Sequence, residues 1–298
     1  MPDIQMRLFK DMLVLAGPVE EALARHGFEM PRDLPYICLM EPETLEDAIR
    51  TEAASGAPCL VAPTADITTA RLAHVRMADD ASAIARAAVA AVRELRPQHI
   101  LAEIGPCGLP LDASAKASLN ENRSQYAGAA RALADLPLDA IFLNGFTRLA
   151  DLKCALMGVA QVTDLPVFAS VRVADGMLDD GYGSTPFADA LAAMADLGAA
   201  VIGFETAEPI DAAVGYANQA TACGLPMLAQ LSVEERAPKQ GGPTPENPYY
   251  CADTMERAAV ALYGAGVQFL RATGKATPAY AGALHATVSG LDVKGYAE

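Results

Sequence analysis

The stretch Gly266-Val-Gln-Phe-Leu-Arg-Ala-Thr-Gly-Lys-Ala-Thr-Pro278 decides how this chain of 298 residues folds. Residues 267–270 predict a buried apolar strand, residues 271–276 predict a polar turn, and a helix begins next. Thr277 suits the N-cap of that helix and Pro278 its first position. In a barrel of alternating strands and helices this is the last unit, and its turn lies on the face where such barrels perform chemistry.

Short apolar strand candidates alternate with helical patterns along the rest of the chain. Strands are predicted at 12–17, 59–63, 99–104, 139–143, 166–173, 200–204 and 226–231. Helices are predicted at 18–26, 42–55, 68–95 with a break near 78–80, 121–136, 149–162, 186–197, 210–223, 252–264 and 278–289. Residues 34–40, 175–184 and the Pro- and Gly-rich 234–250 are predicted to be irregular, and 234–250 is a lid or a subunit contact.

The number of strand–helix units, roughly eight, closes a parallel barrel. We therefore predict an α/β protein, a single (β/α)8 TIM barrel in which residues 1–298 form one domain. A doubly wound open sheet is the alternative. It typically has a Gly-rich dinucleotide turn after the first strand, whereas Ala16-Gly17-Pro18 stands there instead.

The composition excludes several classes of function. The formal net charge of −15 argues against nucleic acid or an anionic membrane surface as a partner. No charge-free apolar run reaches the roughly 18 residues that a membrane span needs, and the first residues lack the apolar core of a signal peptide. The scattered cysteines form no Cys-x-x-Cys pair and are predicted to be reduced thiols. We expect a cytoplasmic protein.

Polar residues at the carboxyl ends of the predicted strands are the candidates for chemistry. They are Thr64, Glu103, Asn144, Ser170, Arg172, Glu205, Thr206, Gln230, Arg271 and Thr273. Two carboxylates and two guanidiniums that converge on one mouth are costly to desolvate unless they pair. The group is therefore either a structural ion-pair network or a binding site for a charged, amino-acid-like substrate.

Glu205 is the leading catalytic candidate, because an apolar wall beside a carboxylate suits a general base. Its alternative role is an ion pair with Arg172 or Arg271. The turn Thr273-Gly274-Lys275 before a capped helix could bind an anion, although an ordinary capped turn has the same composition. Cys107 is the one thiol expected to reach the active face, and a buried structural role is favoured even there. The histidines form no metal pattern.

Several short motifs follow the order and spacing of one known family. They are Leu13-Val14-Leu15-Ala16-Gly17, Glu41-Pro42-Glu43, Ile104-Gly105-Pro106 with Gly108, Gly183-Ser184-Thr185-Pro186, and Thr277-Pro278. Through them, and over nearly its whole length, the chain resembles the homocysteine S-methyltransferase family, which includes the homocysteine-binding barrel of cobalamin-dependent methionine synthase. The resemblance implies the barrel fold.

The departures from this family fall on its chemistry. The family binds zinc through one Cys after strand six and a Cys-Cys pair after strand eight. Here the matching stretches are Gly203-Phe204-Glu205-Thr206 and Arg271-Ala272-Thr273-Gly274, so all three thiolates are missing. A Glu and a Thr do not replace three soft ligands for a metal that activates a thiol. We predict no metal site and no cofactor, and the methyl donor stays open.

Three hypotheses follow. The first is a diverged, zinc-free family member that binds a small polar, amino-acid-like substrate, and methyl transfer is the reaction that the resemblance implies. In it Glu205 is the acid/base or ammonium-binding group, and the substrate contacts are Glu103, Asn144, Arg172, Thr206, Gln230, Arg271 and Thr273. The second is a lyase or aldolase-type barrel acting on a phosphorylated or carboxylated substrate. The third is a non-catalytic binding partner of a corrinoid protein. A homo-oligomer is possible in each case.

Overall fold

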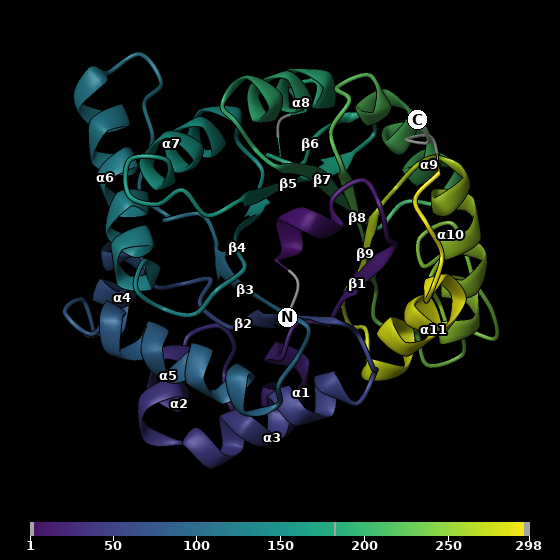
Figure 1. The fold of residues 1–298 in the computed structure, drawn as a ribbon, viewed down its shortest axis with the longest axis horizontal. Helices are drawn as coiled ribbons and strands as arrows, with labels where there is room; N and C mark the ends of the chain where they lie inside the picture. The colour runs from purple at the N-terminus through teal and green to yellow at the C-terminus, as the bar shows by residue number, and fades with distance from the viewer. Residues whose placement is uncertain (1–2, 182, 295–298) are drawn as a thin grey trace.

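A computed structural model describes residues 3–181 and 183–294. In these residues eight parallel strands close into a barrel (Figure 1). They are β1 (Leu13–Leu15), β2 (Cys59–Ala62), β3 (His99–Ile104), β4 (Ala140–Phe146), β5 (Val167–Ala174), β7 (Val201–Thr206), β8 (Met227–Val233) and β9 (Phe269–Gly274). Each strand pairs with its neighbour, and β1 pairs with β9 while β4 pairs with β5, which closes the ring. The predicted (β/α)8 barrel is confirmed.

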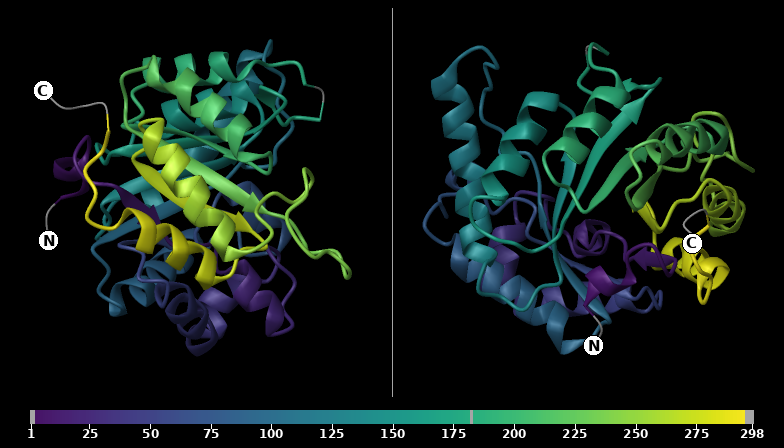
Figure 2. Two further views of the ribbon diagram at one scale, coloured as in Figure 1. Left: turned by 90° about the vertical axis from the view of Figure 1, so that its right-hand side faces the viewer. Right: turned by 45° about the horizontal axis from the view of Figure 1, so that its top comes forward.

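Helices surround the strands as an outer ring, which Figures 1 and 2 show from three sides. They are α1 (Glu20–Arg25), α2 (Leu34–Met40), α3 (Pro42–Ala53), α4 (Thr69–His74), α5 (Ala81–Glu94), α6 (Lys116–Leu133), α7 (Leu149–Val159), α8 (Phe187–Asp196), α9 (Ile210–Thr221), α10 (Ala252–Gly264) and α11 (Pro278–Val288). In the described residues no helix is long and apolar enough to cross a membrane.

Alternation along each strand builds two apolar layers, because successive side chains of a strand point to opposite faces. Leu13 and Leu15 belong to a buried cluster inside the barrel, whereas Val14 belongs to the layer between strands and helices. The inner cluster contains Phe168 and Phe269, whose rings meet edge to face with centroids 4.8 Å apart. The barrel interior is therefore a packed core below its carboxyl end.

The amino-terminal end of the barrel is closed by the start of the chain. The short 3-10 helix η1 (Ile4–Arg7) lies across the opening, and Ile4 is fully buried in the inner cluster (Figure 1). The side chain of Gln268 fixes this segment: it accepts a hydrogen bond from the Phe9 amide and donates to the carbonyl oxygens of Arg7 and Asp11. The opposite, carboxyl end is thus the one left for a site.

Several predicted boundaries are wrong. Residues 34–40 were expected to be irregular but form α2, in which Leu34, Ile37 and Cys38 are buried at the i, i+3, i+4 spacing of a helix face. The expected loop 175–184 contains the short strand β6 (Met177–Leu178), antiparallel to β5. Helix α6 begins five residues before the predicted start at position 121. Residues 234–250 form no helix or strand, as predicted.

The expected polar turn at 271–276 is also wrong, because β9 continues to Gly274. Arg271 pairs in register with Gln230 of β8, and Thr273 pairs with Ser232. Thr277 does hold the N-cap position of α11, but its side chain makes no capping hydrogen bond. That residues 1–298 form one domain stays a prediction.

Candidate functional site

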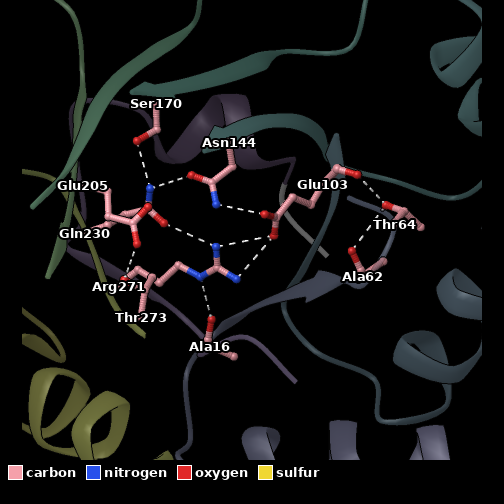
Figure 3. A network of polar contacts seen from close by, with 10 residues as sticks. All are labelled: Ala16, Ala62, Thr64, Glu103, Asn144, Ser170, Glu205, Gln230, Arg271 and Thr273. Atoms are coloured by element: carbon pink, nitrogen blue, oxygen red, sulfur yellow. Dashed lines mark hydrogen bonds and ion pairs between the residues drawn. The ribbon is translucent and has the colours of Figure 1, made fainter. Parts of the chain in front are cut away.

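Strand register brings the predicted polar residues to one level of the barrel mouth. Arg172, Glu205, Gln230 and Arg271 are successive register partners across β5, β7, β8 and β9. Glu103 on β3 and Asn144 on β4 complete the ring from the other side (Figure 3). These residues point inward because each follows the inward-facing apolar residues of its strand at a spacing of two.

A chain of side-chain hydrogen bonds crosses the mouth (Figure 3). Asn144 Nδ2 donates to Glu103 Oε1 at 2.8 Å. Gln230 Nε2 donates to Asn144 Oδ1 at 2.7 Å and to Ser170 Oγ at 2.8 Å. Because a buried amide costs free energy unless its hydrogen bonds are made, this network holds Gln230 and Asn144 in one orientation.

Arg271 is the centre of this network and is only 1% exposed. Its Nε donates to the carbonyl oxygen of Ala16 at 3.0 Å, and Nη1 donates to Gln230 Oε1 at 3.3 Å. Both Nη atoms lie 3.5 Å from Glu103 Oε2. Each nitrogen of the guanidinium thus has a partner in the protein, and Arg271 forms a buried ion pair with Glu103.

Glu205 has a different environment, because it lies at the edge of a cavity. Thr273 Oγ1 donates to its Oε1 at 2.7 Å, and Arg172 Nε donates to its Oε2 at 3.2 Å. The Arg172 side chain is 54% exposed, whereas that of Glu205 is 9% exposed. Glu205 is therefore oriented by the network and still reachable from outside.

The cavity at Glu205 has a volume of about 210 Å³ and lies over the ends of β5, β7 and β8. Its wall carries the carboxylates of Asp179, Glu205, Glu208 and Glu234 and a single guanidinium, that of Arg172. The volume is below the roughly 300 Å³ of a drug-sized site, so it suits a molecule the size of an amino acid. The charge of the wall favours a positively charged group in that molecule.

The remaining predicted contacts are less accessible to a ligand. Thr206 lines the cavity, but its hydroxyl donates to Glu208 Oε2 and accepts from the Glu208 amide. Thr64 donates to the carbonyl oxygen of Glu103 at 2.8 Å, which fixes a loop. Lys275 of the predicted anion turn forms an ion pair with Glu21. Cys107 is fully buried, with Sγ 3.1 Å from Asn122 Oδ1, so it does not reach the active face and the favoured buried role is confirmed.

The sequence interpretation missed three carboxyl groups that lie near Glu103 or Arg271. Burial, with a smaller contribution from Glu103, raises the pKa of Glu20 to about 7. Burial also raises the pKa of Glu52 to about 7 and raises that of Asp66. A signal for Glu52 was present: it continues the buried face Leu45, Ala48, Ile49 of α3 at position i+7.

The described residues do not fit a thiolate-bound zinc. The stretches that match the family's zinc ligands lie at the mouth, but they supply Glu205, Thr206, Arg271 and Thr273. Within residues 3–181 and 183–294, no group of three or more His, Cys, Asp or Glu side chains could hold a metal ion. Cys38, Cys59, Cys107 and Cys154 are buried, which raises the pKa of each thiol and disfavours the thiolate.

The fold and its polar mouth place the protein among the α/β barrels that carry their sites at the carboxyl ends of the strands. More narrowly, the family model for homocysteine S-methyltransferase matches residues 13–274, and the chain belongs to this family. Membership supports methyl transfer on an amino-acid-like substrate. No curated protein sequence matches the chain.

Solved structures show the same fold at low sequence identity. The oxidized form of the homocysteine methyltransferase MmuM from Escherichia coli is similar with a TM-score of 0.75 at 16% identity, covering 93% of this chain and 96% of that chain. Its metallated form has a TM-score of 0.73 at the same identity and coverage. The carboxyl transferase domain of Rhizobium etli pyruvate carboxylase with pyruvate is more distant, with a TM-score of 0.51 at 13% identity over 91% of this chain and 41% of that chain.

Proposed function

We propose that this protein is a methyl-transfer enzyme that binds a small amino-acid-like molecule in the cavity at Glu205, without a thiolate-bound zinc. The observation that carries the proposal is the setting of Glu205. Its carboxylate is fixed by Thr273 and Arg172, borders an amino-acid-sized cavity and is joined there by three further carboxylates.

Each group at the cavity has a role in this proposal. Glu205 receives the ammonium group of the ligand, because Thr273 and Arg172 hold its carboxylate in position at the edge of the acidic cavity. A role of Glu205 as acid/base is the alternative to this ammonium contact and stays a prediction. Arg172, exposed beside it, contacts the ligand's carboxylate.

The inner ring has a positioning role in the proposal. Arg271 is closed off by Ala16, Gln230 and Glu103, so it supports the site and does not clamp an anion directly. Glu103, Asn144 and Gln230 form the floor beneath the ligand. This assignment replaces the direct contacts expected for these four residues with a supporting layer.

The absence of soft ligands at the mouth separates this proposal from the zinc mechanism expected of the family. A thiol bound here would keep its proton near neutral pH, since no thiolate-stabilising metal fits the donor set. The acidic cavity wall also disfavours the phosphorylated substrate of the lyase alternative. The corrinoid partner and a homo-oligomer stay predictions.

The test is calorimetric binding of L-homocysteine and L-methionine, with 4-mercaptobutyrate as the analogue that lacks the ammonium group. We expect the two amino acids to bind and the analogue to bind at least tenfold more weakly, because hydrogen bonds to charged groups contribute about 1.5–3 kcal/mol. Glu205→Gln should weaken amino-acid binding by a similar factor. Glu246→Gln, an exposed acid of the 234–250 loop, is the matched control and should bind as the parent does.

Metal analysis of the purified protein accompanies the binding test. Sub-stoichiometric zinc is expected. The proposal that no zinc takes part would be overturned by one result: stoichiometric zinc whose removal by a chelator also abolishes homocysteine binding. Equal binding of 4-mercaptobutyrate and L-homocysteine would instead overturn the role of Glu205.

A further inference from the structure

A second cavity lies outside the barrel, between α6, α7 and the segment that precedes α8. These helices follow one another around the outer ring (Figure 1). The cavity has a volume of about 480 Å³, within the range of about 300–1,000 Å³ typical of small-molecule sites. Leu119, Leu149 and Met157 supply an apolar wall, as binding pockets for organic molecules require.

The charged residues that line this cavity are mostly cationic, whereas the chain as a whole is acidic. Arg123, Arg148 and Lys153 line it in a chain whose net charge is −15. The carboxylate of Asp180 is also in the wall, but it accepts hydrogen bonds from the Gly183 amide and the Ser184 hydroxyl. Three cations that converge on a mostly apolar hollow form a local positive field in an acidic protein.

Within the described residues, Arg123 carries an unpaired hydrogen-bond donor beside this cavity. Its Nε atom is buried and has no hydrogen-bond partner in the described part of the chain. Arg123 and Lys153 also form no ion pair with any described residue. A buried guanidinium N–H without an acceptor is destabilising, so the fold retains a donor that only an added acceptor would satisfy.

The start of α7 adds donors to the same wall. Leu149 and Ala150, the first two residues of the helix, line the cavity, and the N-cap residue Arg148 makes no side-chain capping bond. The amides of a first helical turn have no partner within the helix and favour a negative charge. Arg148 is meanwhile held in place, because its Nη2 donates to the carbonyl oxygen of Leu111 at 3.1 Å.

We propose that this cavity is a binding site for a small organic anion, with a carboxylate or phosphate head on Arg123, Arg148 and Lys153 and an apolar body against Leu119, Leu149 and Met157. The site is separate from the acidic cavity at Glu205. In the segment after β5, Asp179 lines the first cavity and Asp180 lines the second. It does not depend on the function proposed for Glu205.

The experiment is titration calorimetry of the full chain with four probes of equal chain length: hexanoate, n-hexyl phosphate, n-hexylamine and 1-hexanol. We expect at least one of the two anions to bind, and the amine and the alcohol to bind at least tenfold more weakly. The stronger anion identifies the head group. Failure of both anions, or equal binding of hexylamine, overturns the proposal.

Variants localise the binding. Arg123→Gln and Lys153→Gln should each weaken binding of the anion by about tenfold, since each removes one charge-assisted hydrogen bond. Arg86→Gln, an exposed arginine of α5 away from the cavity, is the matched control and should leave the affinity unchanged. Circular dichroism melting of each variant checks that it folds. Binding that survives Arg123→Gln and Lys153→Gln together would overturn the assignment to this cavity.

Discussion

The carboxylate of Glu52 occupies the space that a side chain on Gly17 would fill: a Cβ atom built on Gly17 lies 2.7 Å from Glu52 Oε2. Glu52 belongs to α3 and is 3% exposed, and Gly17 follows β1. The contact brings a carboxyl group from the outer ring to the loop that also supplies the Ala16 carbonyl to Arg271. Two layers of the barrel thus meet at a group whose charge is costly to bury.

The first prediction concerns pH. The folded-state pKa of Glu52, about 7, lies above its ordinary value of 4.5, so the folded protein binds more protons than the unfolded chain between these values. The contribution of Glu52 to stability is complete below pH 4.5 and is lost as pH rises through 7. At pH 8 Glu52→Gln should therefore be more stable than the parent by up to about 3 kcal/mol.

Chemical denaturation at pH 4.5 and pH 8 measures this effect. The stability difference between Glu52→Gln and the parent should grow with pH, while Glu43→Gln, at an exposed position of the same helix, should show no such growth. The pKa of Glu20 is also raised to about 7. The free energy of unfolding should therefore still fall with pH in both the parent and Glu52→Gln. A difference that is constant with pH would contradict the prediction.

The second prediction concerns Arg271. Arg271→Met leaves the Glu103 carboxylate without its cation in a nearly closed network, and we expect a loss of about 3–5 kcal/mol in the free energy of unfolding. Arg172→Met removes an exposed partner of Glu205 and should lower the free energy of unfolding by less than about 1 kcal/mol. Urea unfolding compares the two.

A second change separates charge from packing at this position. Adding Glu103→Gln to Arg271→Met should restore part of the stability, because the uncompensated charge is then gone. No recovery in the double variant would mean that Arg271 acts through its packing over the Phe142 ring, whose centroid lies 5.4 Å away, and not through its charge.

The third prediction pairs two glycines. A Cβ atom on Gly203 of β7 would lie 2.7 Å from the Leu228 carbonyl oxygen, and backbone there cannot give way without shifting β8. Gly203→Ala should destabilise the protein by about 1–3 kcal/mol or more. Gly215→Ala in α9 meets nothing within 4 Å and should stabilise it by about 0.5–1 kcal/mol. Thermal unfolding of both variants measures the two changes in stability. Equal effects of Gly203→Ala and Gly215→Ala would contradict the role given to strand packing at Gly203.

The fourth prediction concerns thiol chemistry. Cys223 and Cys251 are partly exposed, whereas the other four cysteines are buried. Burial also raises the pKa of Cys38 to about 12, which suppresses its thiolate. A thiol-specific chromogenic reagent should therefore react fast with two thiols in the native protein and with all six after denaturation. In Cys223→Ser/Cys251→Ser no fast thiol should remain, and a third fast thiol would contradict the burial.

The barrel could be predicted because its strands repeat one pattern, a short apolar run before a helical period. The ends of the strands could not. Strand β7 was expected to stop at Phe204 but continues through Glu205 and Thr206, and β9 continues through Arg271 to Gly274. Polar residues inside a barrel mouth look like loop residues in a sequence, because the hydrogen bonds that make their burial tolerable come from other strands.

The candidate site was predictable only as a set of positions. The sequence placed Glu205 and Arg271 at one mouth, but it could not separate them, since their exposure depends on which neighbours close over each side chain. The fully bonded Arg271 and the cavity-facing Glu205 emerge only from register and packing. Residues 34–40 show the same limit in the fold: a continuous apolar run hid the helical spacing of Leu34, Ile37 and Cys38.

The amino-terminal end of the barrel is closed by contacts between residues that are far apart in the sequence. Gln268 holds the Phe9 amide and the carbonyl oxygens of Arg7 and Asp11, residues 257 to 261 positions away along the chain. The residues before β1 and the strand β9 must therefore come together before this end of the barrel closes. Its closure is a long-range step of folding, because contacts between residues so far apart carry a large cost in chain entropy.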